Sequence, residues 1–298
     1  MSELHLHETL HPTRNAHAAF AGLVGLDHEK SRLVEELALL LDASRLDRWR
    51  KKHHPKGLSV LQRISKGAPL VVLAGEVGCG KTALATCVAS PVAEALDAQV
   101  LCLETPSNVR GSGLVGEISN RITTVFSMAR SRLNGPTKHG ILVIDEADDL
   151  ATSRTQLQAH HEDRAALNVL VKQIDLVARD AVGLAVILVT NRLAVIDPAI
   201  RRRVALDIEF RRPNKDARRL MFSSMLDGAE ATKAEIEELV RISERKTVPF
   251  SSSDLIHRVA RLALTEARVR DEPFSAALVL DALSKTEPTP LLGDAVIT

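Results

Sequence analysis

The chain has 298 residues, of which 45% are hydrophobic and 26% charged, and its formal net charge is +1. This composition is typical of a globular protein with one large core or two smaller ones. No apolar stretch approaches the roughly 20 residues of a membrane span, and no signal-peptide core is present, so we expect a cytoplasmic protein. Aromatic residues make up only 2% of the chain, which argues against a surface that stacks single-stranded nucleic acid.

The first 18 residues are polar and rich in histidine, and we expect them to form a solvated tail. They contain His7-Glu8-Thr9-Leu10-His11, which matches the H-E-x-x-H pattern of zinc proteases. That pattern needs a stable helix that brings both imidazoles to one face, and a third ligand as well. Here a proline follows at once, so we do not expect a zinc site.

An apolar stretch with two glycines, residues 20–26, precedes a helix with leucines at helical spacing. Such a stretch, placed ahead of a phosphate loop, often packs on the adenine, so Val24 and Gly25 are candidate nucleotide contacts; ordinary core is the alternative. The basic cluster from Arg48 to Lys56 is expected to be a solvated face or a subunit contact, with an anion or nucleic-acid site as the alternative.

The apolar run at 70–74 leads into a phosphate-binding loop of the form G-x-x-x-x-G-K-[ST]. Its residues are Gly75, Glu76, Val77, Gly78, Cys79, Gly80, Lys81 and Thr82. Helix-forming residues follow at 83–89, so strand, loop and helix come in the required order. Backbone N–H groups of such a loop surround phosphates, its lysine reaches the β- and γ-phosphates, and its hydroxyl binds Mg²⁺. We therefore expect ATP and Mg²⁺ here.

A second strand is expected at 99–104. It is followed by Gly111-Ser112-Gly113-Leu114-Val115-Gly116, in which two apolar side chains lie among three glycines. This pattern is typical of a mobile, protruding loop tip and differs from a core segment.

Polar residues follow the next two predicted strands, at 141–144 and 184–190. The first strand is apolar throughout, as in a strand buried on both faces, and ends in Asp145-Glu146. Ligands collect at the carboxyl ends of parallel strands. We expect Asp145 to hold Mg²⁺ and Glu146 to orient and deprotonate the attacking water. Asn191, after the second strand, can hydrogen-bond the γ-phosphate and that water; a plain turn asparagine is the alternative.

Three consecutive arginines, Arg201, Arg202 and Arg203, follow a short Asp-Pro turn. They cannot all face one phosphate of their own subunit, so we expect one to act across an interface on a neighbour's nucleotide. An ordinary surface run is the alternative. Residues 206–210 then alternate as an edge strand.

From residue 214 to about 285 only helical periods occur, which predicts a small all-helical second domain. The expected division is a polar N-terminal tail at 1–18, a large α/β nucleotide-binding domain at 19–212, a helical lid at 213–286 and a C-terminal tail at 287–298.

In this order, the phosphate loop, the acidic strand end, the strand-end asparagine, the arginine run and the helical domain resemble an AAA+ ATPase over roughly residues 20–285. The resemblance implies an α/β class P-loop AAA+ fold, with a five-stranded parallel sheet flanked by helices and a small all-helical C-terminal lid. It also implies a ring, usually of six subunits, with ATP at each interface. Arg203 aligns best with the arginine finger of that family, and Arg202 is the second candidate.

The resemblance further marks Leu114-Val115-Gly116 as the pore loop that grips a polypeptide, although Leu114 replaces the usual aromatic residue. Glu76-Val77 stands where two prolines are common, and Cys79 where threonine is common. Ser253 occupies the place of a nucleotide-sensing arginine, which Arg258 or Arg261 would have to replace.

Within that family, residues 148–154, 163–164 and 168–175 resemble the pachytene-checkpoint group, which remodels HORMA-domain proteins by pulling on their N-termini. Bacterial members accompany antiphage operons with a HORMA protein and a cyclic-oligonucleotide synthase. The resemblance implies a homohexameric ATPase that unfolds or disassembles a protein partner. The expected partner is a HORMA-domain protein, and neither a membrane nor a nucleic acid is expected as a partner. A DNA-associated AAA+ protein, such as a loader or transposition helper, is the alternative.

Overall fold

The computed structural model describes residues 4–61, 67–106, 116–135, 137–147, 161–180, 182–191, 196–244 and 247–291. It divides into two compact units, each of which is described by itself. The first comprises Met1–Phe20, His28–Ala74 and Thr82–Glu209, and the second comprises Ala21–Asp27, Gly75–Lys81 and Phe210–Thr298. The phosphate loop and residues 21–27 thus group with the helical part, whereas the sequence had assigned them to the large α/β domain. Within the described ranges, no helix has the length and apolar character needed to cross a bilayer.

The first unit is built on a mixed six-stranded sheet with the order β1-β3-β4-β5-β2-β6. Its strands are β1 (His7–His11), β2 (Leu70–Gly75), β3 (Val100–Glu104), β4 (His139–Ile144), β5 (Leu184–Thr190) and β6 (Val204–Phe210). Strands β3, β4, β5 and β2 run parallel to their neighbours in this series. All five predicted strands are confirmed. The expected five-stranded, wholly parallel sheet is wrong, because β1 adds a sixth strand antiparallel to β3.

Strand β1 also corrects the expectation that residues 1–18 form a solvated tail. It pairs with β3 from His7↔Glu104 to His11↔Val100, and Glu8 accepts hydrogen bonds of 2.9 and 3.1 Å from Arg132 Nε. The H-E-x-x-H residues are therefore extended, and at about 3.3 Å per residue the two histidines lie roughly 13 Å apart along the strand. At that separation they cannot share one metal ion. Pairing with the exposed edge of β3 stabilises a segment whose own composition does not favour a strand.

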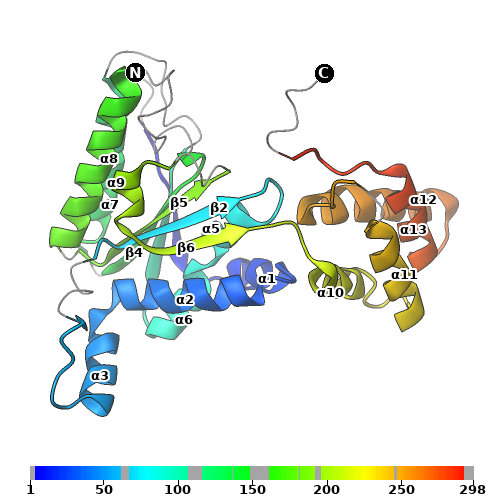
Figure 1. The fold of residues 1–298 in the computed structure, drawn as a ribbon, viewed down its shortest axis with the longest axis horizontal. Coiled ribbons are helices and arrows are strands. Elements are labelled where there is room, and N and C mark those ends of the chain that lie inside the picture. The colour runs from blue at the N-terminus through cyan, green and yellow to red at the C-terminus, as the bar shows by residue number, and fades with distance from the viewer. Residues whose placement is uncertain are drawn as a thin grey trace. The chain divides into compact units, whose positions relative to one another are not determined.

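Helices cover both faces of the sheet (Figure 1). One side carries α2 (Asp27–Leu41), α5 (Lys81–Cys87) and α6 (Ala89–Leu96), and the other carries α7 (Glu117–Arg132), α8 (His161–Asp180) and α9 (Pro198–Arg201). Helices α1 (Arg14–Gly22) and α3 (Ala43–His53) complete the unit. Strands β2 and β5 are buried along nearly their whole length. Because successive side chains of a strand point to opposite faces, a strand covered on both sides must be apolar throughout. The prediction of such a strand at residues 141–144 is confirmed, because β4 is buried from Gly140 to Ile144.

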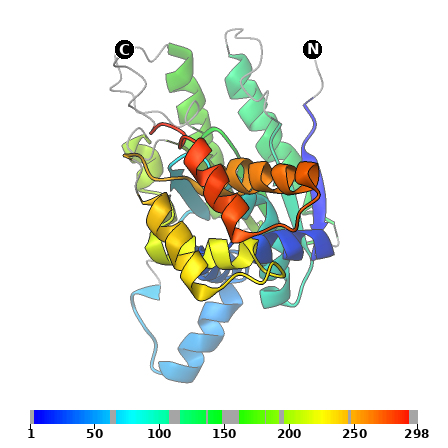
Figure 2. The same ribbon diagram turned by 90° about the vertical axis from the view of Figure 1, so that its right-hand side faces the viewer.

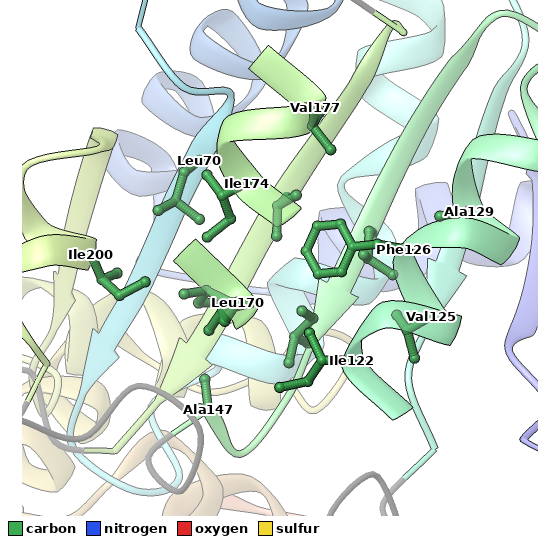
Figure 3. Packing of buried hydrophobic residues seen from close by; sticks show 14 of the residues in the cluster. Leu70, Ile122, Val125, Phe126, Ala129, Ala147, Leu170, Ile174, Val177 and Ile200 are labelled. Atoms are coloured by element: carbon green, nitrogen blue, oxygen red, sulfur yellow. The ribbon is translucent and has the colours of Figure 1, made fainter. Parts of the chain in front are cut away.

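The larger core lies between the sheet and the pair α7 and α8. Phe126 of α7 is fully buried there, and the labelled side chains of the two helices meet over the strands in Figure 3. Leu170 and Ile174, four residues apart on α8, face the same core, as helical spacing requires. This packing holds β4 and β5, the strands that end at the predicted catalytic residues, in fixed register.

The second unit confirms the predicted all-helical C-terminal part. Its helices are α10 (Lys215–Met225), α11 (Lys233–Ser243), the π-helical segment η3 (Asp254–Ala260), α12 (Arg261–Arg270) and α13 (Ala276–Lys285). Figure 2 shows α12 in orange beside α13 in red. Thr232 begins α11 with a capping box, in which its hydroxyl accepts from Glu235 N and the Glu235 carboxylate accepts from Thr232 N. The core is built around fully buried Phe222 and Phe250.

The segment after α13 corrects the expectation of a free C-terminal tail as far as Pro290. Asp254, which is 1% exposed, accepts hydrogen bonds from Thr289 N (3.1 Å), Thr289 Oγ1 (2.6 Å) and Ser251 N (3.0 Å). These hydrogen bonds, together with one from Arg258, hold the pKa of Asp254 at about 2 although burial acts in the opposite direction. The segment is therefore fixed to the start of η3.

The end of β1 supplies a test of the sixth strand. His11 is 3% exposed, and its Nδ1 lies 2.8 Å from Ser90 Oγ on α6. Burial, with a smaller contribution from His17, lowers the pKa of His11 below its ordinary value of 6.5. The unfolded chain therefore binds a proton at this residue more readily than the folded chain, so the free energy of unfolding falls as the pH drops below about 6.5.

We expect His11→Gln to make the stability less dependent on pH between about pH 7.5 and about pH 5.5. Urea unfolding of the variant and the wild type at both pH values measures this. His28→Gln, which changes an exposed histidine of α2, is the matched control. An unchanged pH dependence in His11→Gln would show that His11 is not buried in the neutral form.

Candidate nucleotide-binding and hydrolysis site

The register of the parallel strands gathers the predicted catalytic residues of the first unit at one edge of the sheet. Ala74 of β2 pairs with Thr190 of β5, and Ile144 of β4 pairs with Leu188 of β5. Asp145 and Asn191, which directly follow β4 and β5, therefore emerge at the same carboxyl edge, and β2 enters the phosphate loop there. The structure brings together the acidic and amide side chains that the sequence placed at separate strand ends.

Glu146 has an unusual backbone conformation. Its φ is +53°, in the left-handed region that side-chain-bearing residues rarely adopt. Its N–H donates a 2.8 Å hydrogen bond to Asp145 Oδ1, and the next residue, Ala147, is fully buried. Asp145 and Ala147 thus anchor the backbone on either side while the Glu146 residue is exposed.

Glu104 is a carboxylate of the same edge that sequence reasoning did not assign to the site. It is the last residue of β3, next to β4 in the sheet. Burial raises the pKa of Glu104, the negative charge of Asp145 raises it further, and His7 lowers it. The only signal in the sequence was a polar residue ending an apolar strand; its closeness to Asp145 follows from strand order.

In the second unit, the start of the phosphate loop is set by the backbone of Phe210. The φ of Gly75 is +129°, and a Cβ at this position would lie 2.0 Å from Phe210 O. The same carbonyl accepts a 2.9 Å hydrogen bond from Glu76 N. Glycine is therefore required here by the close approach of a second backbone segment as well as by its φ.

The loop fits a polyphosphate ligand. Lys81 is buried, and its Nζ donates hydrogen bonds to Gly75 O (2.9 Å) and Glu76 O (2.7 Å), so an ammonium group faces the inside of the loop. Gly78 and Gly80 have φ values of +74° and +94°, and side chains there would meet neighbouring atoms at 2.8 and 3.1 Å. A loop of glycines in left-handed conformations can turn its N–H groups toward one anion, with the lysine as counter-charge.

The remaining loop residues differ in their surroundings. Val77 is 39% exposed, whereas Cys79 is buried and its Sγ lies 3.7 Å from Val77 O. Burial raises the pKa of the Cys79 thiol, so the side chain remains a neutral filler between the glycines. Thr82, which together with Asp145 is a candidate Mg²⁺ ligand, is exposed in the first turn of α5.

The helical part of the second unit contacts the loop directly. Ser253 N donates a 2.8 Å hydrogen bond to Gly78 O, and a Cβ on Gly78 would lie 2.8 Å from Ser251 Oγ. Ser253, expected to replace a sensor arginine, thus lies against the phosphate loop. Of the two arginines considered as substitutes, Arg258 pairs with Asp254 at 2.9 Å, and Arg261 is exposed at the start of α12.

The predicted adenine contacts, Val24 and Gly25, lie between the loop and α10. Val24 packs against the core of the helical unit, and a Cβ on Gly25 would lie 3.0 Å from Ala217 Cβ. Leu26 Cδ1 lies 3.1 Å from the Cβ position of Gly80. The structure places this segment beside the phosphate loop and against the helical core, and its contact with the base stays a prediction.

The arginine run follows α9, which Asp197 caps by accepting a 2.7 Å hydrogen bond from Ala199 N. Arg203 forms a two-pronged ion pair with Asp175 of α8, at 2.6 and 2.8 Å, and this pair raises the pKa of its guanidinium. Arg202 is exposed, and its Nε donates to Pro198 O at 3.2 Å. The two finger candidates therefore differ in their partners, because the guanidinium of Arg203 is held by a carboxylate and that of Arg202 donates to a backbone carbonyl.

The predicted pore loop is only partly covered by the structure. Leu114 and Val115 lie outside the described residues. Gly116 caps the N-terminus of α7 with a φ of +78°.

Three comparisons with known proteins agree with this geometry. Residues 71–212 match the family described as AAA, the ATPase family associated with various cellular activities. The chain is 37% identical over 287 residues to CD-NTase-associated protein 6 of Escherichia coli strain MS 115-1, covering 92% of this chain and 91% of that protein.

Two solved structures share the fold over nearly the whole length. A chain of the E. coli MS115-1 HORMA:CdnC:Trip13 complex matches with a TM-score of 0.90 and 34% identity, covering 97% of each chain. Trip13 from Rhizobiales matches with a TM-score of 0.74 and 32% identity, covering 95% of this chain and 98% of that one. The chain belongs to the AAA family of ATPases, in the group of CD-NTase-associated protein 6 and Trip13.

Proposed function

We propose that this ATPase assembles into a hexameric ring in the cytoplasm and couples Mg²⁺-dependent ATP hydrolysis to the remodelling of a HORMA-domain protein in an antiphage CD-NTase system. The observation that carries the proposal is the full-length likeness to a chain of a complex of HORMA, CdnC and Trip13. The name of the E. coli relative, a CD-NTase-associated protein, supports the same context.

The residues of this chain divide the chemistry among them. Lys81 and the loop N–H groups bind the β- and γ-phosphates, and Val24 and Gly25 contact the base. Magnesium, when bound, neutralises phosphate charge, and the oxygens of Thr82 and Asp145 are its candidate ligands. Glu146 accepts a proton on its carboxylate from the attacking water, and Asn191 orients that water through its amide.

A second subunit completes the site in this proposal. Arg203, with Arg202 as the second candidate, places a guanidinium on the γ-phosphate of the neighbouring protomer, where it stabilises charge in the transition state. The ion pair with Asp175 has to open for this to happen. Exchange of Asp175 for the neighbour's nucleotide is favourable for Arg203, because the nucleotide carries more negative charge than one carboxylate.

Remodelling requires a grip on the partner as well as hydrolysis. Leu114-Val115-Gly116 is the segment we assign to this role, with an apolar pair that holds an extended polypeptide by side-chain contact.

The left-handed conformation of Glu146 provides a test of its assignment as the general base. For a residue with a side chain it costs about 1 kcal/mol or more, so the fold retains strain where the proposal places the general base. We expect Glu146→Gly to be more stable than Glu146→Ala by about 1 kcal/mol in urea unfolding, while both lose at least about 100-fold in ATP turnover.

Asp97, with a φ of +51° at the end of α6, is the matched control for this comparison. Asp97→Gly should exceed Asp97→Ala in stability by a similar margin without loss of ATP turnover. Equal stability of the two Glu146 variants would show that the native residue is not strained.

The partner assignment is tested with Glu146→Gln, which keeps the shape of the side chain but cannot accept the proton. We expect it to bind ATP and to hold a HORMA-domain protein from the same organism in a stable complex, with turnover reduced at least about 100-fold. Wild-type turnover should rise when that HORMA protein is added, and Leu114→Ala should lose the increase. Stimulation by DNA with a steep salt dependence, and none by the HORMA protein, would favour the DNA-associated alternative.

The shared site is tested by mixing two inactive proteins. Arg203→Ala should bind ATP but hydrolyse it roughly 10³-fold more slowly. In a mixed ring, its intact Glu146 receives Arg203 from a Glu146→Gln neighbour, so the mixture should regain activity that neither variant has alone. The same mixing experiment with Arg202→Ala tests the second candidate. Recovery of activity only with this variant would identify Arg202 as the finger. No recovery with either arginine variant would contradict a site shared between subunits.

A further inference from the structure

The phosphate loop of this chain contains a carboxylate residue, although the ligand that we propose for it is a polyanion. Glu76 is the second residue of the loop, and its backbone is fixed at both ends: its N–H donates to Phe210 O at 2.9 Å, and its carbonyl accepts from Lys81 Nζ at 2.7 Å. The backbone of Glu76 is therefore held beside the phosphate-binding lysine. An unpaired negative charge here would repel phosphate and would attract the ammonium group that the phosphates need.

Arg212 is the cation that faces this carboxylate. It stands two residues after Phe210, its side chain is only 5% exposed, and its Nε lies 3.6 Å from Glu76 Oε2. The guanidinium also donates to Pro249 O, and through Nη2 to Pro290 O at 3.2 Å. Arg212 therefore connects the phosphate loop to the segment before η3 and to the segment after α13.

Each of the two groups has one buried charged atom, although the Glu76 side chain as a whole is 33% exposed. In the part of the chain that the structure describes, Glu76 Oε2 and Arg212 Nε are both buried and neither has a hydrogen-bond partner. A buried charge without a partner is costly, and removal of one member of a buried ion pair leaves the other uncompensated. The pair is neutral as a unit, so the net charge that faces the ligand is that of Lys81.

We propose that Arg212 is a positioning residue for the nucleotide, which neutralises the carboxylate of Glu76 in the phosphate loop. This inference rests on the proposed function, because it concerns how the same loop accepts a nucleoside polyphosphate. It assigns Glu76 to the balance of charge in the loop, in addition to the backbone contacts.

The proposal predicts effects of opposite sign for the two members of the pair. Arg212→Gln leaves the carboxylate uncompensated, so the affinity for a nucleotide falls. Glu76→Gln removes the repulsive charge and leaves Arg212 as an additional cation, so the affinity stays the same or rises. In the double variant neither charge remains, and the affinity returns toward that of the wild type. A purely structural role for Arg212 would instead make the double variant at least as weak as Arg212→Gln.

The experiment is an equilibrium titration of the full-length proteins with fluorescently labelled ADP, which measures binding without hydrolysis. We expect the Kd of Arg212→Gln to increase about tenfold, equivalent to about 1.4 kcal/mol, and that of Glu76→Gln not to increase. The Kd of the double variant should lie within about threefold of the wild-type value. Arg212→Lys, which keeps the charge and loses the fork of donors, should bind more tightly than Arg212→Gln.

Arg241→Gln is the matched control, since it removes the same charge from an exposed residue of the same unit, whose guanidinium pairs with Glu238 of its own helix, and should bind as the wild type does. Thermal unfolding of each variant shows whether it is folded. If Arg212→Gln does not fold, Glu76→Gln still decides: weaker binding by this variant overturns the proposal. A double variant as weak as Arg212→Gln, or Arg212→Gln with wild-type affinity, also overturns it. Absence of binding by the wild type would contradict the proposed function itself.

Discussion

The contact between the carbonyl of Phe210 and the beginning of the phosphate loop is the constraint on which the rest of the nucleotide site depends. This oxygen accepts the N–H of Glu76 and leaves no room for a side chain on Gly75. The loop is therefore fixed by the segment that leads into the helical unit. Lys81 has a defined position because it donates hydrogen bonds to the carbonyls of Gly75 and Glu76. Two residues after Phe210 comes Arg212, the arginine that pairs with the Glu76 carboxylate.

Charge at the site is arranged by two different means. At the carboxyl edge of the sheet, Glu104 and Asp145 are close enough for the negative charge of Asp145 to raise the pKa of Glu104, a situation that favours the arrival of a cation. Within the phosphate loop the opposite is required, because the ligand is an anion. There Glu76 is opposed by buried Arg212, and Lys81 supplies the positive charge. The Mg²⁺-dependent hydrolysis that we propose needs both environments.

The helical unit contacts the phosphate loop through the backbone of Ser253, the residue that stands where the family has a sensor arginine. Ser253 N binds Gly78 O, and Asp254 ties the start of η3 to Thr289. These hydrogen bonds connect the loop, the start of the helical core and the segment after α13 in one series. The helical unit is therefore in direct contact with the loop that we propose binds the nucleotide.

The sequence by itself determined the five main strands, the helical C-terminal part, the phosphate loop and the order of Asp145, Glu146 and Asn191, because these depend on local periodicity and on motifs in which neighbouring residues act together. The tertiary structure alone decided that residues 7–11 form a sixth strand, that Glu104 lies near Asp145 and that Glu76 meets Arg212. Each of these pairs residues far apart in the chain. Strand order, register and burial create such pairs through packing of the whole chain, and no local pattern records them.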